Sequence, residues 1–384
     1  MPPDDLTRAT AWLRAWDSQG FHRTATAGDE AGAAWLAAEA EKLGAAPAIE
    51  EFVLDRLDPV VAHVEIEGER IAGVPVFDAP PTDAQGIAGR IGPVGSAAEV
   101  GVVELSPHAV YAPDYKRLRR ESRHAALVIV CNGARPGLGL LNAEQFGAPY
   151  GTPAIQVPSE MRDMVITAAA RRGRARVVSE SRRTPAYARN VVAKIPGRTP
   201  RRAPVVVMTP RSSWWQSTAE RGGGLVCWLE TLRALLAAPP GPDVVLTANS
   251  GHELGHLGLN DFLARRPGWE RPPAEGGAVW VHYGANIGAA DGELSLLSGD
   301  PDLARLAAEE LTRAGHPPAR IAPPSLVPSG ETRDIHRAGG RYVTLVGSNS
   351  WFHLPDDRWP DAVDAAAVAR IATGAAATVR LLTR

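Results

Sequence analysis

The pattern of apolar and polar positions divides the chain into a helical head, a strand-rich middle and a long alternating C-terminal part. Apolar side chains recur at helical spacing in two segments between residues 4 and 44, and the second segment ends at Gly44. Alternating apolar and polar positions then predict short strands, with FVLDRL and VVAHVEI as two separate ones. Further strands are expected at HAALVIVC, and RARVVSESRR and NVVAKIPG again read as two.

From residue 200 onward, predicted strands and helices alternate. The apolar runs PVVVMTP, DVVLTANSG, GAVWVHYG and RYVTLVGS predict buried strands, and GGGLVCWLETLRALLAA and HELGHLGLNDFLARR predict two of the helices between them. This alternation is typical of an α/β fold with a mostly parallel sheet that helices cover on both faces. Chemistry in such sheets collects beyond the carboxyl ends of the strands. The loops expected there are TPRSSWWQSTAERGGG, ANSGHELGH and GSNSWFH.

Composition narrows the class of protein. The chain has 384 residues, a formal net charge of −2 and 45% hydrophobic residues, which indicates a globular protein of two domains or of one domain with an insertion. It has no general basic field, so nucleic acid is not an expected partner. The N-terminal residues lack the apolar core of a signal peptide, and no apolar run reaches membrane-spanning length. We therefore expect a cytoplasmic protein with no membrane partner, in which Cys131 and Cys227 are buried free thiols.

The string HELGH at residues 252–256 has two interpretations. On one helix, H-E-x-x-H places two imidazoles one turn apart to bind zinc, with the glutamate as general base. The strand directly before it and the glycines Gly251 and Gly255 favour a strand–helix junction instead.

Several segments resemble those of the zinc aminopeptidase and glutaminyl cyclase family. TANSGHELGHLG is similar to the family's Glu-Glu-x-Gly-Leu-x-Gly segment, PVVVMTPRSS to its strand ending in His-x-Asp-Ser, and WFHLPDDRWPDAVD to its closing segment. STAERGGGLVCWLE resembles the segment that opens a long helix, and FHRTATAGDEAGAAWLAAEAEKLG resembles the opening helix pair. The resemblance implies a zinc-exopeptidase-like catalytic domain at residues 1–55 and 190–384. The strand-rich residues 56–189 resemble an inserted protease-associated domain.

The resemblance also implies an altered metal site. It places Glu220, Glu253 and His353 at one metal position, but Pro210 and Ser212 stand where the family has a histidine and an aspartate. One divalent ion, with zinc as the first choice, is therefore expected rather than two, and two carboxylates with one imidazole also suit a catalytic zinc. The alternative for Glu220 is an ion pair with the adjacent Arg221 at the start of the following helix.

Other polar residues of these loops are candidates for catalysis and substrate binding. His252 occupies the position of the family's general base, although it could instead be a ligand, and Arg221 and His282 complete the predicted catalytic set. His282 could equally be a core histidine. Trp351 and the pair Trp214 and Trp215 are expected to rim the site. Arg211 joins Arg221 as a binder of a substrate carboxylate.

Three functional hypotheses follow. The first is a single-metal hydrolase that acts on an amide or peptide-like bond of a small, partly apolar substrate. The second is a catalytically silent protein that binds a ligand or partner, because Pro210, Ser212 and His252 replace residues the reaction needs. The third is an enzyme of the same fold with another reaction, such as cyclisation or acyl transfer. We also allow for a homodimer, with the inserted domain either capping the site or mediating dimer contacts.

Overall fold

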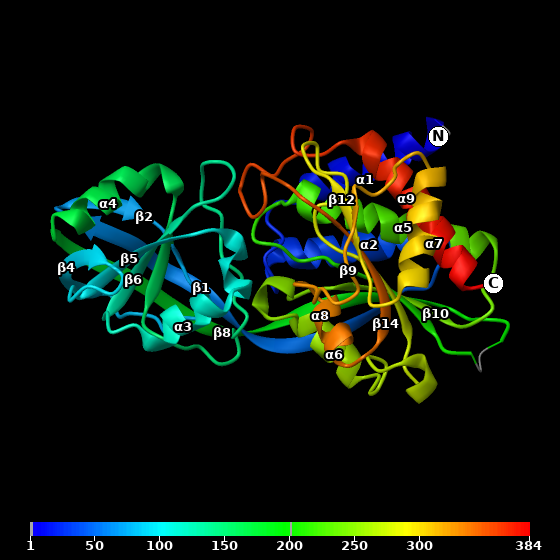
Figure 1. Ribbon diagram of the computed structural model, residues 1–384, viewed down its shortest axis with the longest axis horizontal. Coiled ribbons are helices and arrows are strands. Elements are labelled where there is room, and N and C mark those ends of the chain that lie inside the picture. Colours follow the sequence, from blue (N-terminus) through cyan, green and yellow to red (C-terminus); the bar gives the residue numbers. More distant parts are fainter. Residues whose placement is uncertain (1–2, 200–201) are drawn as a thin grey trace.

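Two lobes joined by a pair of long strands make up the molecule (Figure 1). The structure is a computed structural model that describes residues 3–199 and 202–384. The joining strands are β1 (Ala48–Ile66) and β8 (Arg174–Ile195), which run antiparallel. The N-terminal helices and the C-terminal half of the chain form the larger lobe. The residues between the two strands form the smaller lobe.

Each joining strand is longer than the sequence pattern predicts. We expected two strands in each place, but β1 and β8 pair along almost their whole length across the junction of the lobes. The register shifts only between Pro59 and Val61. Proline interrupts the pattern there without ending the strand, because the second neighbour of β1, strand β2 (Glu69–Ala72), begins to pair only at His63. An edge position tolerates a residue that cannot donate a backbone hydrogen bond.

The larger lobe contains the part of the chain in which strands and helices alternate. Its strands follow the order β13-β12-β14-β11-β9-β10-β8, with β9, β10, β11 and β14 parallel to one another. The predicted α/β fold with a mixed, mostly parallel sheet is therefore confirmed. The strands are β9 (Val205–Pro210), β10 (Val244–Asn249), β11 (Val279–Tyr283), β12 (Leu294–Leu297), β13 (Arg320–Ile321) and β14 (Arg341–Gly347).

Helices cover both faces of this sheet. One hydrophobic core contains Val205 and Val207 of β9 together with α1, α2, α5, α7 and α9. Val206 and Met208 point the other way and pack with α6 and α8. The helices are α1 (Pro3–Asp17), α2 (Ala27–Lys42), α5 (Gly223–Ala237), α6 (Leu257–Ala264), α7 (Pro301–Arg313), α8 (Thr332–Arg337) and α9 (Ala365–Leu382).

Helix α9 is long and apolar enough to cross a membrane by length and composition alone. More than half of it is buried inside the molecule, where it packs against α5 and α7. A core helix passes the same test, so this helix by itself indicates core packing. The two cysteines, Cys131 and Cys227, are buried and free, as expected.

The smaller lobe has hydrophobic clusters of its own on the two faces of β5, β6 and β7. The expected limits of the inserted domain, residues 56–189, fall within β1 and β8, which belong to both lobes. Its likeness to a protease-associated domain stays a prediction. The elements are β3 (Val74–Pro75), β4 (Ile87–Pro93), β5 (Val100–Leu105), β6 (Ala126–Cys131), β7 (Ala154–Val157), α3 (Pro113–Glu121) and α4 (Arg162–Ala170).

Candidate functional site

A buried charged centre lies beyond the carboxyl ends of β9, β10 and β14. Four side chains from the three expected loops meet there: Glu220, Arg221, Glu253 and His353. Each has at most 1% of its surface exposed. The sequence thus identified correctly which loops and which carboxylates come together.

The guanidinium of Arg221 lies between the two carboxylates. Its Nη2 is 2.8 Å from Oε1 of Glu220 and 3.0 Å from Oε1 of Glu253. Its Nε donates to the backbone carbonyl of Ser212 at 2.7 Å. The ion pair that we considered as the alternative for Glu220 is therefore what the structure shows.

A single turn of π-helix, Thr218–Gly222, places Glu220 in this centre just before α5 begins. The carboxylate of Asp357 accepts the backbone N–H groups of Ala219 and Glu220 at 2.7 and 3.0 Å and so holds the turn in place. Burial and the nearby Glu220 raise the pKa of Asp357 to about 8. Burial opposes ionisation of Glu220, but Arg221 and then His353 outweigh it and lower the pKa of Glu220 to about 2.

Glu253 is held from its other side by a serine. Ser212 Oγ donates to Glu253 Oε2 at 2.7 Å and accepts the backbone N–H of Gly251 at 2.8 Å. Thr24 adds a longer contact of 3.4 Å to the same oxygen. Burial raises the pKa of Glu253, which Arg221 and Ser212 counteract only in part. Two carboxylates thus share one arginine.

The predicted metal ligands meet, but they do not form a metal site. Glu220 and Glu253 both contact the Arg221 guanidinium, and His353 Nε2 lies 3.4 Å from Glu220 Oε1. Among the described residues, no group of three or more His, Cys, Asp or Glu could hold a metal ion. Zinc binds carboxylate oxygens at about 2.0–2.2 Å. The Arg221 nitrogen already lies between those oxygens with a positive charge, so the residues as arranged do not fit the expected divalent ion.

Next to this centre lies a second group of buried polar side chains. His252 Nδ1 is 3.5 Å from Oε1 of Glu331, whose other oxygen accepts from Asn249 at 3.3 Å. Neither ring nitrogen of His282 has a hydrogen-bond partner among the described residues. Burial lowers the pKa of His282 to about 3 and that of His252 well below its usual value. Both imidazoles are therefore uncharged near neutral pH.

Glu331 was missed by sequence reasoning. It precedes α8 in a segment with no motif and no apolar periodicity. Asp357 carried a signal, since it belongs to the closing segment that resembles the zinc aminopeptidases. It was not singled out because its role is to hold the backbone of a residue far away in the sequence.

The HELGH string does not lie on one helix, so the H-E-x-x-H arrangement is wrong. Residues 252–254 form a short 3₁₀ turn, and α6 begins only at Leu257. Gly251, Gly255 and His256 all have positive φ, of 80°, 77° and 60°. These left-handed residues turn Glu253 toward Arg221. His256 turns to Asp334, with Nδ1 at 3.1 Å from its carboxylate.

Two of the three candidate tryptophans line a cavity between the lobes. Trp214 and Trp215 are on its wall, whereas Trp351 packs with the core of the larger lobe and with Arg135, whose guanidinium lies 3.6 Å from the centre of its ring. The cavity measures about 430 Å³. Its walls include Phe21, Arg23, Phe77 and Leu140 as well as these two tryptophans.

Arg211 does not reach this cavity. It is fully buried, 2.9 Å from Oδ1 of Asp29, and donates to the backbone carbonyl of Arg189 at 2.7 Å. Its predicted role as a carboxylate binder has no support in this position, because no substrate can contact it. Arg23, which the sequence reasoning passed over, is the arginine on the cavity wall. It pairs with Asp58 at 3.3 Å.

A loop of the smaller lobe covers the charged centre. The carbonyl of Leu140 lies 2.5 Å from Nδ1 of His353, and the N–H of Ala143 donates to the carbonyl of Glu253 at 2.7 Å. Trp214 Nε1 donates to the side chain of Asn142 at 3.0 Å. Residues of this loop thus contact both His353 and Glu253, and its Leu140 also lies on the wall of the cavity.

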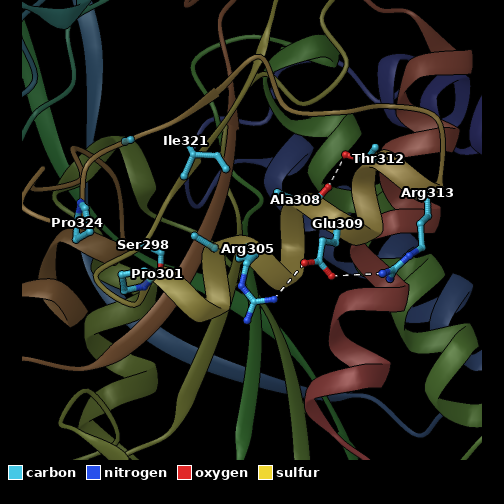
Figure 2. Close-up of a pocket in the computed structure, with 11 residues that line it drawn as sticks. Ser298, Pro301, Arg305, Ala308, Glu309, Thr312, Arg313, Ile321 and Pro324 are labelled. Atoms are coloured by element: carbon cyan, nitrogen blue, oxygen red, sulfur yellow. Dashed lines mark hydrogen bonds and ion pairs between the residues drawn. The ribbon is translucent and has the colours of Figure 1, made fainter.

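A second cavity lies along α7 (Figure 2) and carries no comparable chemistry. Its charged side chains pair with one another, with Arg305 at 3.1 Å and Arg313 at 3.3 Å from Glu309. It is formed by α7 together with residues near β12 and β13, away from the loops that build the charged centre.

Comparison with known proteins places the fold. No protein-family model and no curated protein matches the chain. Among solved structures it is similar to a zinc aminopeptidase from Bacillus subtilis, with a TM-score of 0.79 over 99% of this chain and 95% of that one, at 16% identity. The fold is that of the zinc aminopeptidases.

Two further structures agree with this fold. A peptidase M28 precursor from Shewanella amazonensis has a TM-score of 0.75 at 15% identity, over 99% of this chain and 97% of its own. An aminopeptidase from Aneurinibacillus sp. strain AM-1 has a TM-score of 0.73 at 14% identity, over 99% and 94%. Each comparison covers 99% of this chain, so the smaller lobe is part of the shared fold.

Proposed function

We propose that this protein binds a small, partly apolar, peptide-like ligand in the cavity between its lobes and does not hydrolyse it through a metal. The observation that carries this proposal is the guanidinium of Arg221 between Glu220 and Glu253. A metal-dependent peptidase needs a cation with an open coordination position for water or substrate. Arg221 supplies the positive charge but no such position.

The class of ligand is proposed from the fold and from the cavity. The similar solved structures are named as zinc aminopeptidases and peptidases, which supports a peptide-like ligand. A cavity of about 430 Å³ lies at the lower end of the range for small-molecule sites. Its aromatic wall suits an apolar side chain. Phe21, half exposed, packs edge-on to Trp215 with ring centroids 5.2 Å apart, at the open side of this wall.

Metal-independent hydrolysis is a second candidate, and one contact favours it. His252 is uncharged and its Nδ1 faces the Glu331 carboxylate at 3.5 Å. A histidine in this arrangement can take a proton from water through Nε2, and the carboxylate then stabilises the imidazolium. The loop that holds Leu140 and Ala143 would have to move before a substrate reached His252.

The test is to measure binding and turnover in the same samples. N-acetyl-L-phenylalanine amide should bind in isothermal titration calorimetry, and N-acetylglycine amide should bind more weakly because it lacks the apolar group. Trp215→Ala should weaken binding of the phenylalanine compound about tenfold. Trp35→Phe, in the core of the larger lobe, is the control that should leave binding unchanged.

Product release decides between the candidates. Binding without release of ammonia, with or without a chelator, agrees with the proposal. Release that a chelator does not reduce and that His252→Ala abolishes would favour metal-independent hydrolysis. Release that a chelator abolishes, or no saturable binding of N-acetyl amides of phenylalanine, leucine or tryptophan, would overturn the proposal.

We propose a cytoplasmic location and partners other than nucleic acid and membranes, on the composition alone. A homodimer also stays a proposal.

A further inference from the structure

We infer that the cavity between the lobes selects ligands with a free carboxylate next to a large apolar group, and that Arg23 binds this carboxylate. The inference rests on the proposed function and narrows it from a peptide-like ligand to a small apolar acid. Such an acid is an N-acylated amino acid or the carboxyl-terminal residue of a short peptide. Arg23 is then the residue that determines specificity.

The first observation is the charge of the cavity wall. Most of the wall is aromatic or aliphatic, and Arg23 is the one charged side chain among the described residues that line it. None of these lining residues is an aspartate or a glutamate, so a ligand with a positively charged amino group has no counter-charge there. A wall whose charge is positive favours a ligand whose charge is negative.

The second observation is that the other side-chain donors of the wall are already used. The indole N–H groups of Trp214 and Trp215 both donate to acceptors within the protein, at 3.0 and 2.8 Å. The hydroxyl of Thr26 donates to the backbone carbonyl of Arg23 at 2.6 Å. A ligand oxygen that needs a side-chain donor on this wall must therefore find it at Arg23.

The third observation is that Arg23 has only a weak hold on its own counter-charge. Its Nη1 donates to the carbonyl of Leu57 at 2.7 Å, but its Nη2 reaches Asp58 Oδ1 only at 3.3 Å. Arg56 binds both oxygens of the same Asp58 more closely, at 2.8 and 3.0 Å. A guanidinium carries five N–H groups in a fork that fits a carboxylate. Arg23 can therefore accept a second carboxylate.

The surroundings of Arg23 strengthen such a contact. Its side chain is 24% exposed, so a ligand can reach it although most of it is shielded from water. Burial lowers the pKa of Arg23, and Asp58 offsets this effect only in part. The ordinary pKa of arginine is so high that the group stays charged near neutral pH. A hydrogen bond between two charged groups is stronger in a shielded place than in water.

The charged and the aromatic parts of the wall are adjacent. The guanidinium carbon of Arg23 lies 5.6 Å from the ring centre of Phe77. The ring of Phe77 lies 4.6 Å from that of Trp214, measured between centroids. One amino acid spans these distances, so a single ligand residue can place its side chain against the rings and its carboxylate on the guanidinium.

The experiment compares matched acids, amides and amines by isothermal titration calorimetry at pH 7. N-acetyl-L-phenylalanine should bind at least tenfold more tightly than N-acetyl-L-phenylalanine amide, because the acid adds a hydrogen bond between charged groups. Phenethylamine, an aromatic cation, should bind most weakly. N-acetyl-diglycyl-L-phenylalanine distinguishes the two sources of the carboxylate. Affinity equal to that of the shorter acid supports a peptide terminus, and weaker binding supports an N-acylated amino acid.

Three variants test the role of Arg23. Arg23→Gln should remove the advantage of the acid, so that acid and amide bind within about threefold of each other, and Arg23→Lys should retain part of it. Asp58→Asn removes the carboxylate that competes for Arg23 and should tighten binding of the acid several-fold, but not binding of the amide. A gain in affinity cannot come from partial unfolding.

Arg183→Gln is the matched control. Arg183 is half-buried like Arg23 and donates to two backbone carbonyls, at 3.0 and 3.1 Å, but it does not line the cavity. The ratio of the two dissociation constants, for acid and for amide, should stay at its wild-type value in this variant.

The inference is overturned if the wild-type protein binds the amide as tightly as the acid, or if Arg23→Gln keeps the advantage of the acid. The proposed function survives either result, because the amide still binds. Absence of binding by every acid and amide overturns the proposed function and this inference with it. Should Arg23→Gln fail to fold, Asp58→Asn decides, since tighter binding of the acid supports the inference and unchanged binding overturns it.

Discussion

Two buried arginines, ten positions apart in the sequence, have different surroundings. Arg211 follows β9 directly, and its guanidinium meets one carboxylate, Asp29, and backbone carbonyls. Arg221 lies in the next turn and meets two carboxylates, Glu220 and Glu253. Both arginines have at most 1% of their surface exposed. The two arginines therefore differ in the number and kind of their partners.

The comparison distinguishes an ion pair that stabilises the fold from a candidate site. We call the buried pair of Arg211 and Asp29 the structural tie. Around Arg211 the charges balance one to one, and Ser250 and the N–H of Ala25 satisfy Asp29 from its other side. Around Arg221 two carboxylates face one guanidinium. A buried ion pair is weak evidence for stability and no evidence for function. The sharing of one guanidinium by two carboxylates, next to the imidazole of His353, marks the second arginine.

The largest expected effect is on the structural tie. Asp29→Ala leaves Arg211 buried without a counter-charge and should lower the free energy of unfolding by about 3–5 kcal/mol. Urea denaturation followed by circular dichroism measures it. Asp261→Ala, which breaks an exposed pair with Arg265, is the control and should cost less than about 1 kcal/mol. A loss for Asp29→Ala as small as the control would show that Arg211 is not a tie.

The next effect depends on pH and concerns two buried histidines, His22 and His282. Burial lowers the pKa of both His22, beside Arg211, and His282 to about 3. The unfolded chain takes up a proton on each below about pH 6.5, whereas the folded chain does not. The wild-type protein should therefore lose stability relative to His282→Leu by about 1.4 kcal/mol per pH unit between pH 6.5 and 4.5.

The same measurement on the two histidines separates the regions. His22→Leu should show the same trend with pH, but it should also cost about 1 kcal/mol at pH 7, because the Nδ1 of His22 bonds to the carbonyl of Gln216. His282 has no such partner among the described residues. Urea titrations at four pH values test both variants. If the difference in unfolding free energy between each variant and the wild-type protein does not change with pH, the assignment of uncharged imidazoles is wrong.

A smaller loss is expected when one of the paired carboxylates is removed. Glu253→Ala leaves Arg221 with Glu220 as counter-charge, so the cost should be about 1–3 kcal/mol, less than for Asp29→Ala. Glu253→Gln retains a partner for Ser212 and should cost less still. Thermal melts of Asp29→Ala, Glu253→Ala and Glu253→Gln give the order of the three losses in stability. A cost for Glu253→Ala above that of Asp29→Ala would mean that Glu220 does not compensate Arg221.

The smallest effects come from the serine next to each carboxylate. Ser250→Ala removes one hydrogen bond to Asp29, at 2.7 Å, and should cost about 1 kcal/mol. Ser212→Ala should cost about 2 kcal/mol, because Ser212 also accepts the N–H of Gly251, which would be left unpaired. Both values are read from urea midpoints. Equal losses would show that the loop around Glu253 re-forms its bonds without Ser212.

Much of the fold could be predicted from periodicity alone. The buried strands β9, β10, β11 and β14 and the helices between them follow from apolar runs and amphipathic spacing, since burial on both faces of a parallel sheet requires those patterns. Periodicity failed in two places. It divided β1 and β8 at prolines that an edge strand tolerates, and it extended α6 through residues 252–256, where left-handed backbone breaks the helix.

The candidate site was predicted in its parts but not in its arrangement. The sequence by itself determined that the loops after β9, β10 and β14 would carry the chemistry, and the resemblance to the zinc aminopeptidases pointed to Glu220, Glu253 and His353 within them. Only the tertiary structure decided that Arg221 turns inward between the carboxylates while Arg211 is buried against Asp29. It also decided that Glu331 joins His252 and that a loop of the smaller lobe covers the centre. The physical reason is that side-chain direction in a non-helical turn, and partners distant in sequence, are set by packing and charge neutralisation, which leave no period along the chain.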